Sequence, residues 1–316
     1  MDKKKWDVFV YGDVNIDLII PGVTKFPEPG QEDETEVMET AVGGGAALFA
    51  LGLGKLGLHP VFQGSVGNDL YGRFIQEEFN RRNVDTTLLE VSRTQKTGIS
   101  ISFTNEKDRS FLTLRGTNES LDISGIRLDA AAEAGHIHLT GYAGSRNHDT
   151  YRTLLREIRE KTDATVSFDL GWDSAGEWKK EIYELFPLVD VLFMNETEAI
   201  HYSRMKTAQE AGQDFARYCR VAVIKLGAKG SVAFSEGKCY QKDRYRVTAV
   251  DTTGAGDSFN AGFIYGYLTG RSIPECLSCG NGCGALSVTG LGGNTGFPDV
   301  EKLREFIRQQ ENCQGR

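Results

Sequence analysis

The chain has 316 residues, of which 40% are hydrophobic and 25% charged, a balance typical of a protein with a large buried core. Its formal net charge is −8, and its one basic run is Lys3–Lys5, which argues against a nucleic-acid partner. The first apolar segment, residues 6–20, is interrupted by acidic residues, which excludes a secretory signal or a membrane span there. We therefore expect a cytoplasmic protein that binds neither nucleic acid nor membranes.

The cysteines predict thiols rather than disulfides or a metal site. Six cysteines without a recognisable secretion signal are typical of a protein kept in a reducing compartment. Cys276, Cys279 and Cys283 share one face of a predicted helix, but a fourth ligand at a suitable spacing is missing. We interpret them as small apolar residues that pack in the core.

Predicted strands and helices alternate from an opening strand at residues 7–11 to the end of the chain. A sheet whose strands alternate with helices is mostly parallel and is covered on both faces. We therefore predict one α/β domain over residues 1–316. The further strands are expected at residues 61–64, 136–139, 165–169, 191–194, 221–225 and 231–234. The helices are expected at residues 44–57, 70–82, 149–161, 207–218, 258–270, 274–289 and 299–312.

Two regions interrupt this alternation, at residues 13–42 and 97–116, where strand-like pieces follow one another without a helix between them. Ile99, Ile101 and Phe103 alternate with polar residues, which predicts a sheet with one apolar face. We expect these two insertions to form a small separate β-sheet that covers the active site as a lid.

The most informative segment is Asp251–Phe259, in which a glycine-rich turn leads directly into a helix. Gly254, Ala255 and Gly256 can direct their backbone N–H groups toward one point, and the helix start adds its positive end there. An anion is favoured at that point. Asp257 could accept a proton from an attacking hydroxyl group while the amides stabilise the charge that develops. The segment therefore predicts phosphoryl transfer.

Two segments near the amino end predict contacts with a polar ligand. Asn15 and Asp17 follow the first strand two residues apart, so their side chains project on one side and could bind adjacent hydroxyl groups. Gly43 and Gly44 precede a predicted helix whose first amides offer a second place for a polar ligand.

Two later segments follow predicted strands, at the edge where open α/β sheets bind ligands. Asn195 and Glu198 lie within one helical turn, and a carboxylate there could hold a hydrated Mg²⁺, although this spacing alone is more typical of a helix cap. Lys225, Gly227 and Gly230 connect two strands through a glycine turn, which fits a ligand-binding loop or a plain hairpin.

Taken in order, these segments resemble the ribokinase-like, or PfkB, family of carbohydrate and nucleoside kinases across nearly the whole chain. The most specific part of the resemblance is the sequence DTTGAGD at residues 251–257. The resemblance implies a three-layer α/β core with a β-sheet lid, ATP and Mg²⁺, and transfer of the γ-phosphoryl group to a hydroxymethyl group. Asp257 would be the general base, Gly254–Gly256 the anion hole, and Asn15 and Asp17 the contacts to substrate hydroxyl groups.

The resemblance also assigns the nucleotide, the cations and the assembly. The implied nucleotide-binding residues are Asn195, Lys225, Gly227, Gly230 and Asn281. Magnesium would be held, through water, by Glu198 and Asn195. Potassium is the expected ion of a monovalent-cation site that includes Asp251 and Thr253. Relatives of this kind also imply a homodimer formed through the lid, in which the exposed edges of the lid sheets are covered.

The acceptor side departs from the family pattern. Sugar kinases of this type carry GGxxxN, but Leu48 stands here in place of the asparagine, so an apolar group replaces an amide that faces the sugar. Asp169 is followed by Gly171 and Asp173 where relatives often carry Asn and Arg, which leaves contacts to phosphate from this strand unassigned. Tyr142 lies in a segment that resembles the lining of the substrate pocket.

We therefore predict a kinase that acts on a primary hydroxyl group of a small sugar or sugar derivative. A nucleoside kinase is the first alternative, because an apolar wall for a base could be formed by Leu48, Phe49, Phe103 and Tyr142. A phosphosugar kinase would need a cation for the second phosphate, and Arg115 could supply it. The remaining alternative is a ligand-binding sensor that has lost catalysis, and the retained base argues against it.

Overall fold

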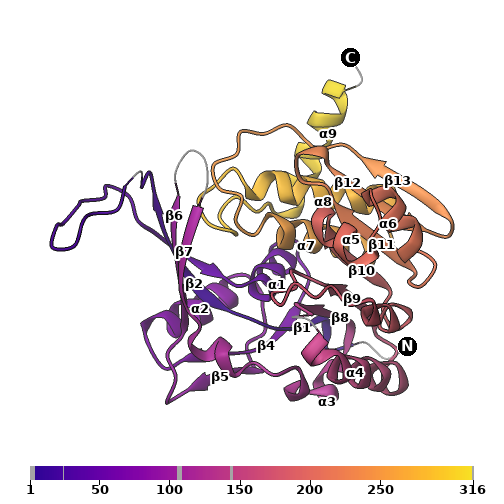
Figure 1. Cartoon of the computed structure of the whole chain (residues 1–316), viewed down its shortest axis with the longest axis horizontal. Helices are drawn as coiled ribbons and strands as arrows, with labels where there is room; N and C mark the ends of the chain where they lie inside the picture. The colour runs from indigo at the N-terminus through magenta and orange to yellow at the C-terminus, as the bar shows by residue number, and fades with distance from the viewer. Residues whose placement is uncertain (1–3, 24, 105–108, 143–144, 315–316) are drawn as a thin grey trace.

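A nine-stranded sheet forms the centre of the computed structural model, which describes residues 4–23, 25–104, 109–142 and 145–314 (Figure 1). Its strands are β1 (Trp6–Tyr11), β4 (Pro60–Gly67), β5 (Leu89–Ser92), β8 (Ala134–Thr140), β9 (Thr165–Asp169), β10 (Val191–Asn195), β11 (Val221–Lys225), β12 (Ser231–Ser235) and β13 (Lys238–Lys242). They lie in the order β13-β12-β11-β10-β9-β8-β1-β4-β5. Neighbours are parallel from β11 to β5, and β12 and β13 form an antiparallel edge.

The inner strands are apolar on both faces because both faces are covered. In β10, Leu192 and Met194 belong to one buried hydrophobic cluster, whereas Val191 and Phe193 belong to a second cluster on the opposite face. A strand buried on both sides appears in a sequence as a continuous apolar run rather than as an alternating pattern. This is why short runs of Val, Ile and Phe mark the central sheet.

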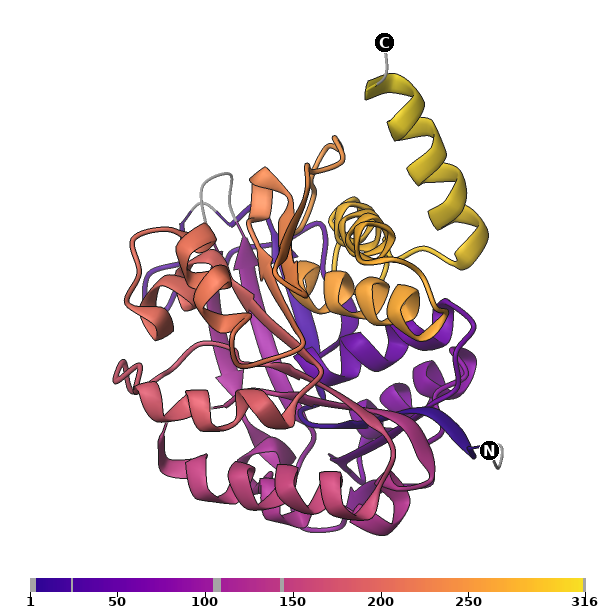
Figure 2. The ribbon, with the colours of Figure 1, turned by 90° about the vertical axis from the view of Figure 1, so that its right-hand side faces the viewer.

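Helices form a layer on each side of the sheet (Figure 2). The first cluster holds the apolar sides of α3 (Leu128–Ala131), α4 (His148–Lys161), α5 (Glu196–Ser203) and α6 (Ala208–Phe215). The second cluster holds those of α1 (Gly45–Lys55), α2 (Leu70–Arg81), α7 (Ala255–Leu268), α8 (Ile273–Ser287) and α9 (Val300–Gln314). The expected three-layer α/β core is therefore confirmed. Within the part of the chain that the structure describes, no helix is both long and apolar enough to cross a membrane.

Glycines bring α7 and α8 into close contact. A Cβ atom on Gly262 would lie 2.6 Å from the carbonyl oxygen of Cys279 and 2.8 Å from the sulfur of Cys283. A Cβ atom on Gly280 would lie 2.8 Å from the ring of Phe259. The buried thiols fill this contact as small apolar groups, and the contact holds the amino end of α7 in a fixed position.

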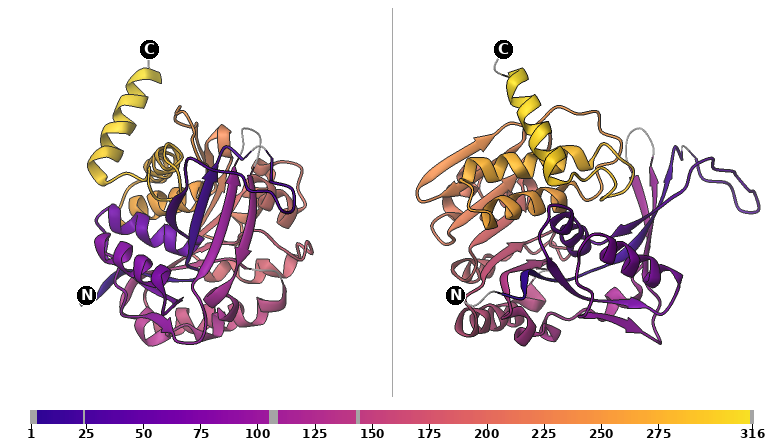
Figure 3. Two further views of the ribbon diagram at one scale, coloured as in Figure 1. Left: turned by 90° about the vertical axis from the view of Figure 1, so that its left-hand side faces the viewer. Right: turned by 180° about the vertical axis from the view of Figure 1, so that it is seen from behind.

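A separate four-stranded sheet projects from the central domain (Figures 1 and 3). Its strands are β2 (Asn15–Pro21), β3 (Glu39–Gly43), β6 (Gly98–Thr104) and β7 (Arg109–Leu114), in the order β3-β2-β6-β7. They come from the two regions of the sequence that interrupt the alternation of strands and helices. We call this sheet the lid.

The register of the lid sheet separates an apolar face from a face on which Asp17 and hydroxyl groups lie beside Ile19 and Phe111; we call the latter the polar face. Asp17 and Leu18 are consecutive in β2, so their side chains lie on opposite faces. Leu18 pairs with Ile101, and Ile101 pairs with Leu112, which gives the apolar face. Phe103 lies two residues from Ile101 and therefore shares the apolar face.

The strands and helices listed from the sequence are present, with ends shifted by a few residues. The elements that the sequence did not predict are short or exposed. β5 is only partly buried, so it lacks an apolar run. α5 has eight residues and follows β10 directly, which leaves little length for a helical pattern to emerge.

Candidate active site

Helix α7 places the glycine turn beside the carboxyl end of β11. Gly254 precedes the helix and has a φ of +67°, a left-handed conformation that residues with a side chain rarely adopt. The helix begins at Ala255, and a Cβ atom on Gly256 would lie 3.4 Å from Nζ of Lys225. The first amides of α7 and a lysine ammonium group therefore lie side by side, which favours an anion between them.

Asp257 lies in the first turn of α7 and faces the start of α1. A Cβ atom on Gly45 would lie 3.0 Å from Oδ1 of Asp257. Burial raises the pKa of Asp257 to about 7. This value includes the effect of nearby charges, of which that of Lys225 lowers the pKa and those of Asp169 and Asp13 raise it. A carboxyl group with a pKa near neutrality is well matched to general-base catalysis.

The first amides of α1 bind Asp13, a residue that the sequence did not mark. Oδ2 of Asp13 accepts a hydrogen bond from the Gly45 amide, and Oδ1 accepts one from the Ala46 amide, both at 3.2 Å. The second amide site expected after Gly43 and Gly44 is therefore filled from within the chain. The left-handed Gly44, at φ +95°, instead allows close approach, because an added Cβ atom would lie 2.6 Å from the backbone oxygen of Asp13.

Asn15 and Asp17 lie together on the polar face of the lid. Nδ2 of Asn15 donates a hydrogen bond to Oδ1 of Asp17 at 2.7 Å. Asp17 is 8% exposed and lies against Gly43, where an added Cβ atom would overlap its carboxylate. Gly43 thus leaves room for the acid. The carboxylate and amide oxygen atoms of this pair are the kind of group that binds adjacent hydroxyl groups.

Two serines that the sequence did not single out extend this polar face. Ser100 pairs with Asp17, and Ser102 pairs with Ile19, so both hydroxyl groups lie on the same side as the acid. The Ser102 hydroxyl is buried and has no hydrogen-bond partner among the described residues. The alternation of the sequence does indicate these positions, but it does not indicate which face covers the site.

Three further residues expected at the substrate lie in different surroundings. Leu48 is 4% exposed, and its Cδ1 atom would lie 2.6 Å from Cβ atoms added to Gly254 or Gly293. Its side chain therefore supports the glycine turn from behind and replaces a sugar contact with a packing contact. Phe103 lies on the apolar face of the lid, away from Asp17. Arg115 follows β7 and is exposed; a Cβ atom added to Gly98, the partner of Asn15 in the lid, would lie 2.8 Å from the Arg115 backbone oxygen.

Tyr142 also lies away from the expected pocket. Its side chain is 1% exposed, and its hydroxyl group is 2.9 Å from Nδ1 of His148. Its ring lies near the rings of Tyr151 and Tyr202, in the aromatic part of the first cluster. The tyrosine follows the end of β8, and the sequence alone does not give the direction of its ring.

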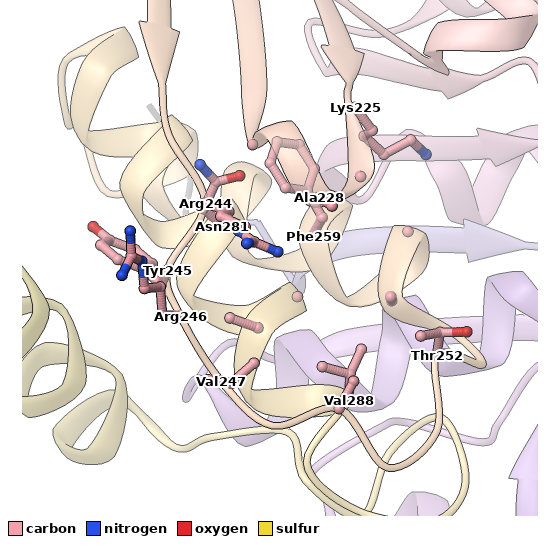
Figure 4. A pocket seen from close by; sticks show the side chains of 17 residues that line it. Lys225, Ala228, Arg244, Tyr245, Arg246, Val247, Thr252, Phe259, Asn281 and Val288 are labelled. Atoms are coloured by element: carbon pink, nitrogen blue, oxygen red, sulfur yellow. The ribbon is translucent and has the colours of Figure 1, made fainter. Parts of the chain in front are cut away.

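A pocket of about 800 Å³ opens next to the glycine turn (Figure 4). Its walls come from the loop after β11, the segment at residues 244–249, α7 and α8. Ala255 and Gly256 lie at its border, so the pocket leads to the first amides of α7. Its volume falls in the range of small-molecule and cofactor sites. Four of the residues expected at the nucleotide line it, namely Lys225, Gly227, Gly230 and Asn281.

Asn281 supports one wall of this pocket. Its Oδ1 atom accepts a hydrogen bond from the Ser231 hydroxyl at 2.9 Å. Its Nδ2 atom donates to the carbonyl oxygens of Lys242 and Asp243, both at 3.1 Å. The side chain therefore joins α8 to β12 and to the start of the segment that borders the pocket.

Asn195 and Glu198 form a reciprocal helix cap at the start of α5. Oδ1 of Asn195 accepts a hydrogen bond from the Glu198 amide, and Oε2 of Glu198 accepts one from the Asn195 amide, both at 2.8 Å. Burial raises the pKa of Glu198, Asp169 adds to this shift, and Lys225 opposes it. The cap interpretation of this spacing is confirmed, and the carboxylate also lies within the charged group around Lys225.

Lys225 is held by a carboxylate that the sequence did not mark as functional. Nζ of Lys225 lies 2.7 Å from Oδ2 of Asp169, at the end of β9. Nδ2 of Asn260, in α7, donates to the same oxygen. Burial alone would lower the pKa of Lys225, but the contact with Asp169 and the charges of Glu198 and Asp257 raise it overall. The lysine is therefore a cation in this site.

Asp251 and Thr253 join the glycine turn to the loop after α8. Oδ1 of Asp251 accepts hydrogen bonds from the amide and the hydroxyl group of Thr253, at 2.9 and 2.7 Å. Oδ2 accepts one from the amide of Gly292 at 3.0 Å. The carbonyl oxygen of Val288 accepts from the amides of Val250 and Asp251, at 2.7 and 3.2 Å.

Comparisons with known proteins agree with this geometry. The model of the pfkB family carbohydrate kinases matches residues 5–300. A protein of Archaeoglobus fulgidus described as an uncharacterized sugar kinase is 30% identical over 251 residues, which cover 78% of this chain and 98% of that protein. The 5-dehydro-2-deoxygluconokinase of Bacillus velezensis is 27% identical, with 100% of this chain and 98% of the relative covered.

The fold is also shared with solved structures. A putative ribokinase II of E. coli, in complex with ATP and Mg²⁺, superimposes with a TM-score of 0.84 at 22% identity, with 96% of this chain and 99% of that one covered. The sequence match spans both the lid strands and the glycine turn. The chain therefore belongs to the pfkB family of carbohydrate kinases, and it is a phosphotransferase with a hydroxyl group as acceptor.

Proposed function

We propose that the protein transfers the γ-phosphoryl group of ATP to a primary hydroxyl group of a small sugar or sugar derivative. The observation that carries this proposal is the position of Asp257. Its carboxylate lies at the start of α1, and the preceding residue, Gly256, lines the pocket of about 800 Å³. Gly43, two residues before α1, lies against Asp17 of the lid. Burial raises the pKa of Asp257 to about 7, which suits a base that works near neutral pH.

In the proposed reaction, Asp257 takes the proton of the acceptor hydroxyl group. The hydroxyl oxygen forms a bond to the γ-phosphorus, and the bond from that phosphorus to the bridging oxygen breaks, so that ADP leaves. The amides of Gly254 and Gly256 are proposed to hold charge on the transferring group, whereas that of Ala255 donates a hydrogen bond to the carbonyl oxygen of Thr252 at 3.4 Å. Asn15 and Asp17 orient the acceptor through its other hydroxyl groups.

The residues around Glu198 fit a magnesium ion held through water. Its Oε2 atom is engaged in the cap of α5, so Oε1 is the oxygen proposed to bind a metal-bound water, with Asn195 beside it. When bound, Mg²⁺ neutralises charge on the phosphates of ATP. The buried Glu198 and Asp169, with one lysine between them, leave a negative environment that suits a cation.

The residues expected to hold potassium fit that role less well. The carboxylate of Asp251 and the carbonyl of Val288 accept hydrogen bonds from within the chain. We propose that Asp251 and Thr253 brace the glycine turn against the loop after α8. No step of the proposed reaction depends on a monovalent cation.

We further propose a homodimer formed through the lids. The apolar face of the lid includes Leu112, which is 65% exposed, and Leu114, which is 55% exposed. Exposed apolar side chains on an edge strand favour contact with a second protein surface. The proposed location is the cytoplasm, where ATP is available and thiols stay reduced. The five described cysteines are all free thiols, consistent with that location.

We propose a sugar rather than a nucleoside as the acceptor. The nucleoside alternative rests on four apolar side chains, namely Leu48, Phe49, Phe103 and Tyr142. Leu48 lies against the glycine turn, and Phe49 is fully buried against the ring of His138. Phe103 lies on the apolar face of the lid, and Tyr142 lies in the aromatic cluster. The face of the lid that carries Asp17 also carries the hydroxyl groups of Ser100 and Ser102, beside Ile19 and Phe111. Polar groups at this spacing suit an acceptor with several hydroxyl groups.

A panel of acceptors tests the proposal directly. Wild-type enzyme with ATP and Mg²⁺ is assayed for ADP release on sugars, sugar acids, aminosugars and nucleosides, including 5-dehydro-2-deoxygluconate, the acceptor in the name of the Bacillus velezensis relative. Asp257→Asn, prepared in the same way, controls for contaminating kinases. We expect ADP release with at least one sugar or sugar acid. Turnover of nucleosides alone, or of none of these acceptors, would contradict the proposal.

A further inference from the structure

Lys225 lies at the junction of the nucleotide pocket and the proposed base. It borders the pocket, and its Nζ atom would lie 3.4 Å from a Cβ atom on Gly256, at the first amides of α7. Its charge also acts on Asp257. The ammonium group is therefore close to the point where the proposed reaction gathers negative charge.

The lysine reaches this point by crossing a neighbouring strand. Lys225 ends β11 opposite Asn195, and Asp169 ends β9 opposite Phe193, so β10 lies between the two. Nζ of Lys225 is nevertheless 2.7 Å from Oδ2 of Asp169, with 15% and 9% of the two side chains exposed. A lysine side chain has many rotamers. The buried carboxylate selects the one in which the ammonium group lies beneath the start of α7.

Asn260 fixes the carboxylate from the other side. It lies one turn after Asp257 in α7, is 1% exposed, and donates a hydrogen bond from Nδ2 to Oδ2 of Asp169. Its Oδ1 atom is buried and has no hydrogen-bond partner among the described residues. Leaving an amide oxygen buried and unpaired is unfavourable. The hydrogen bond to Asp169 therefore accounts for an asparagine at this buried position, whereas packing alone would favour an apolar residue.

We propose that Lys225 is a catalytic residue that stabilises charge on the transferring phosphoryl group, and that Asp169 and Asn260 are positioning residues that hold its ammonium group beside the glycine turn. This inference rests on the proposed phosphoryl transfer from ATP. It differs from two simpler roles. In one, Lys225 only increases affinity for ATP, and in the other, Lys225 and Asp169 are only an ion pair that stabilises the fold.

The three roles are separated by kcat and by the dissociation constant of Mg²⁺-ATP. Lys225→Met is expected to lower kcat by roughly 10² to 10³, the usual effect of removing one group that binds transition-state charge. The dissociation constant should change by less than about threefold, because the interaction strengthens only in the transition state. Asp169→Asn should lower kcat by roughly tenfold, because the ammonium group stays but loses its fixed position.

The double variant Lys225→Met/Asp169→Asn is the sharpest test. If Asp169 acts through the lysine, the double variant should have the same kcat as Lys225→Met. It also keeps the test valid if Lys225→Met folds poorly, because it leaves no unpaired carboxylate in the site. Asn260→Ala should lower kcat in wild type and have no effect in the Lys225→Met background.

A matched control lies at the opposite end of the same strands. Asp190 is paired with Arg159 at 2.8 Å and accepts a hydrogen bond from the Val166 amide in β9. Asp190→Asn removes a paired carboxylate beside β9 without touching the site, so it should leave kcat unchanged even if the melting temperature falls.

Three results would overturn the inference. If the loss of kcat in the double variant equalled the product of the losses in Lys225→Met and Asp169→Asn, Asp169 would act independently of the lysine. A raised dissociation constant for Mg²⁺-ATP with normal kcat would make Lys225 a ground-state contact. A fall in kcat for Asp190→Asn as large as that for Asp169→Asn would reduce the pair to a structural role. Failure of the proposed function itself would appear in the wild type, as absence of turnover with every acceptor, and not in the variants.

Discussion

The nucleotide pocket and the lid are built in different ways. The pocket is enclosed within one chain by helices that glycines bring into contact, and Asn281 ties one wall to β12. The lid is a four-stranded sheet whose outer face carries Leu112 and Leu114 at 65% and 55% exposure. One region is complete by itself, whereas the other presents an apolar face that a second surface can cover.

This difference indicates that the two regions have different roles in the reaction. Groups that take part in bond making need fixed positions, and packed helices and strand ends supply them. Selection of an acceptor needs a surface that can open, and a projecting sheet with few neighbours can do so. We therefore expect changes near α7 to act on catalysis and stability, and changes on the outer face of the lid to act on assembly.

Asp257→Asn should have the largest effect. It removes the proton acceptor while keeping the shape of the side chain, so kcat should fall by roughly 10² to 10⁴. Binding of Mg²⁺-ATP, measured by calorimetry, should change little, because the pocket is formed by other residues. Turnover close to that of the wild type would remove Asp257 from the role of base.

The next effect concerns the lid. Leu112→Glu/Leu114→Glu places two charges on the apolar face, and we expect the dissociation constant of the dimer to rise by roughly 10² or more. Analytical ultracentrifugation measures it. Leu70→Glu is the matched control, since Leu70 is an exposed leucine on α2 at 69% exposure. Equal behaviour of both proteins would show that the lid face is not the interface.

A smaller effect is expected between the helices of the nucleotide side. Gly262→Ala pushes a methyl group against the backbone of Cys279, where an added Cβ atom would lie 2.6 Å from the carbonyl oxygen. We expect the free energy of unfolding to fall by about 1 to 3 kcal/mol. Gly125→Ala is the control, because an added Cβ atom there has nothing within 4 Å. Equal denaturant midpoints for the two variants would contradict the close contact of α7 and α8.

Asn281→Ala should change nucleotide affinity moderately. The variant leaves the Ser231 hydroxyl and the carbonyls of Lys242 and Asp243 without their partner, and the pocket wall loosens. We expect the KM for ATP to rise by about tenfold, equivalent to about 1.4 kcal/mol, with kcat nearly unchanged. Asn68→Ala, on an exposed turn, is the control. A lower kcat at constant KM would place Asn281 in a different role.

Local patterns predict the fold and the glycine turn well. Strands buried on both faces give unmistakable apolar runs, and Gly254 and Gly256 are required by a turn that the backbone makes within a few residues. The direction of a side chain relative to a distant ligand is a different matter. The backbone of Tyr142 is near the site while its ring points into the aromatic cluster, and Leu48 faces the glycine turn from behind.

Residues that act through long-range contacts leave weaker signals. Asp13 caps a helix whose first amides lie more than thirty residues away in sequence. Asp169 meets Lys225 across β10, and the pairing depends on the order of three strands. The alternation in β6 predicts that Phe103 lies on the apolar face of the lid. Which face covers the acceptor depends on Asp17, which lies in another strand.

The pH dependence of kcat/KM for the acceptor tests the central claim most directly. Burial raises the pKa of Asp257 to about 7, and the base must be unprotonated, so kcat/KM should fall on the acid side of that value. The slope should approach a tenfold loss per pH unit, with Mg²⁺ in excess so that the nucleotide stays bound to metal. The residual kcat/KM of Asp257→Asn should not show this fall at acid pH. A wild-type kcat/KM that stays constant down to about pH 5, or the same acid-side fall in Asp257→Asn, would contradict the account.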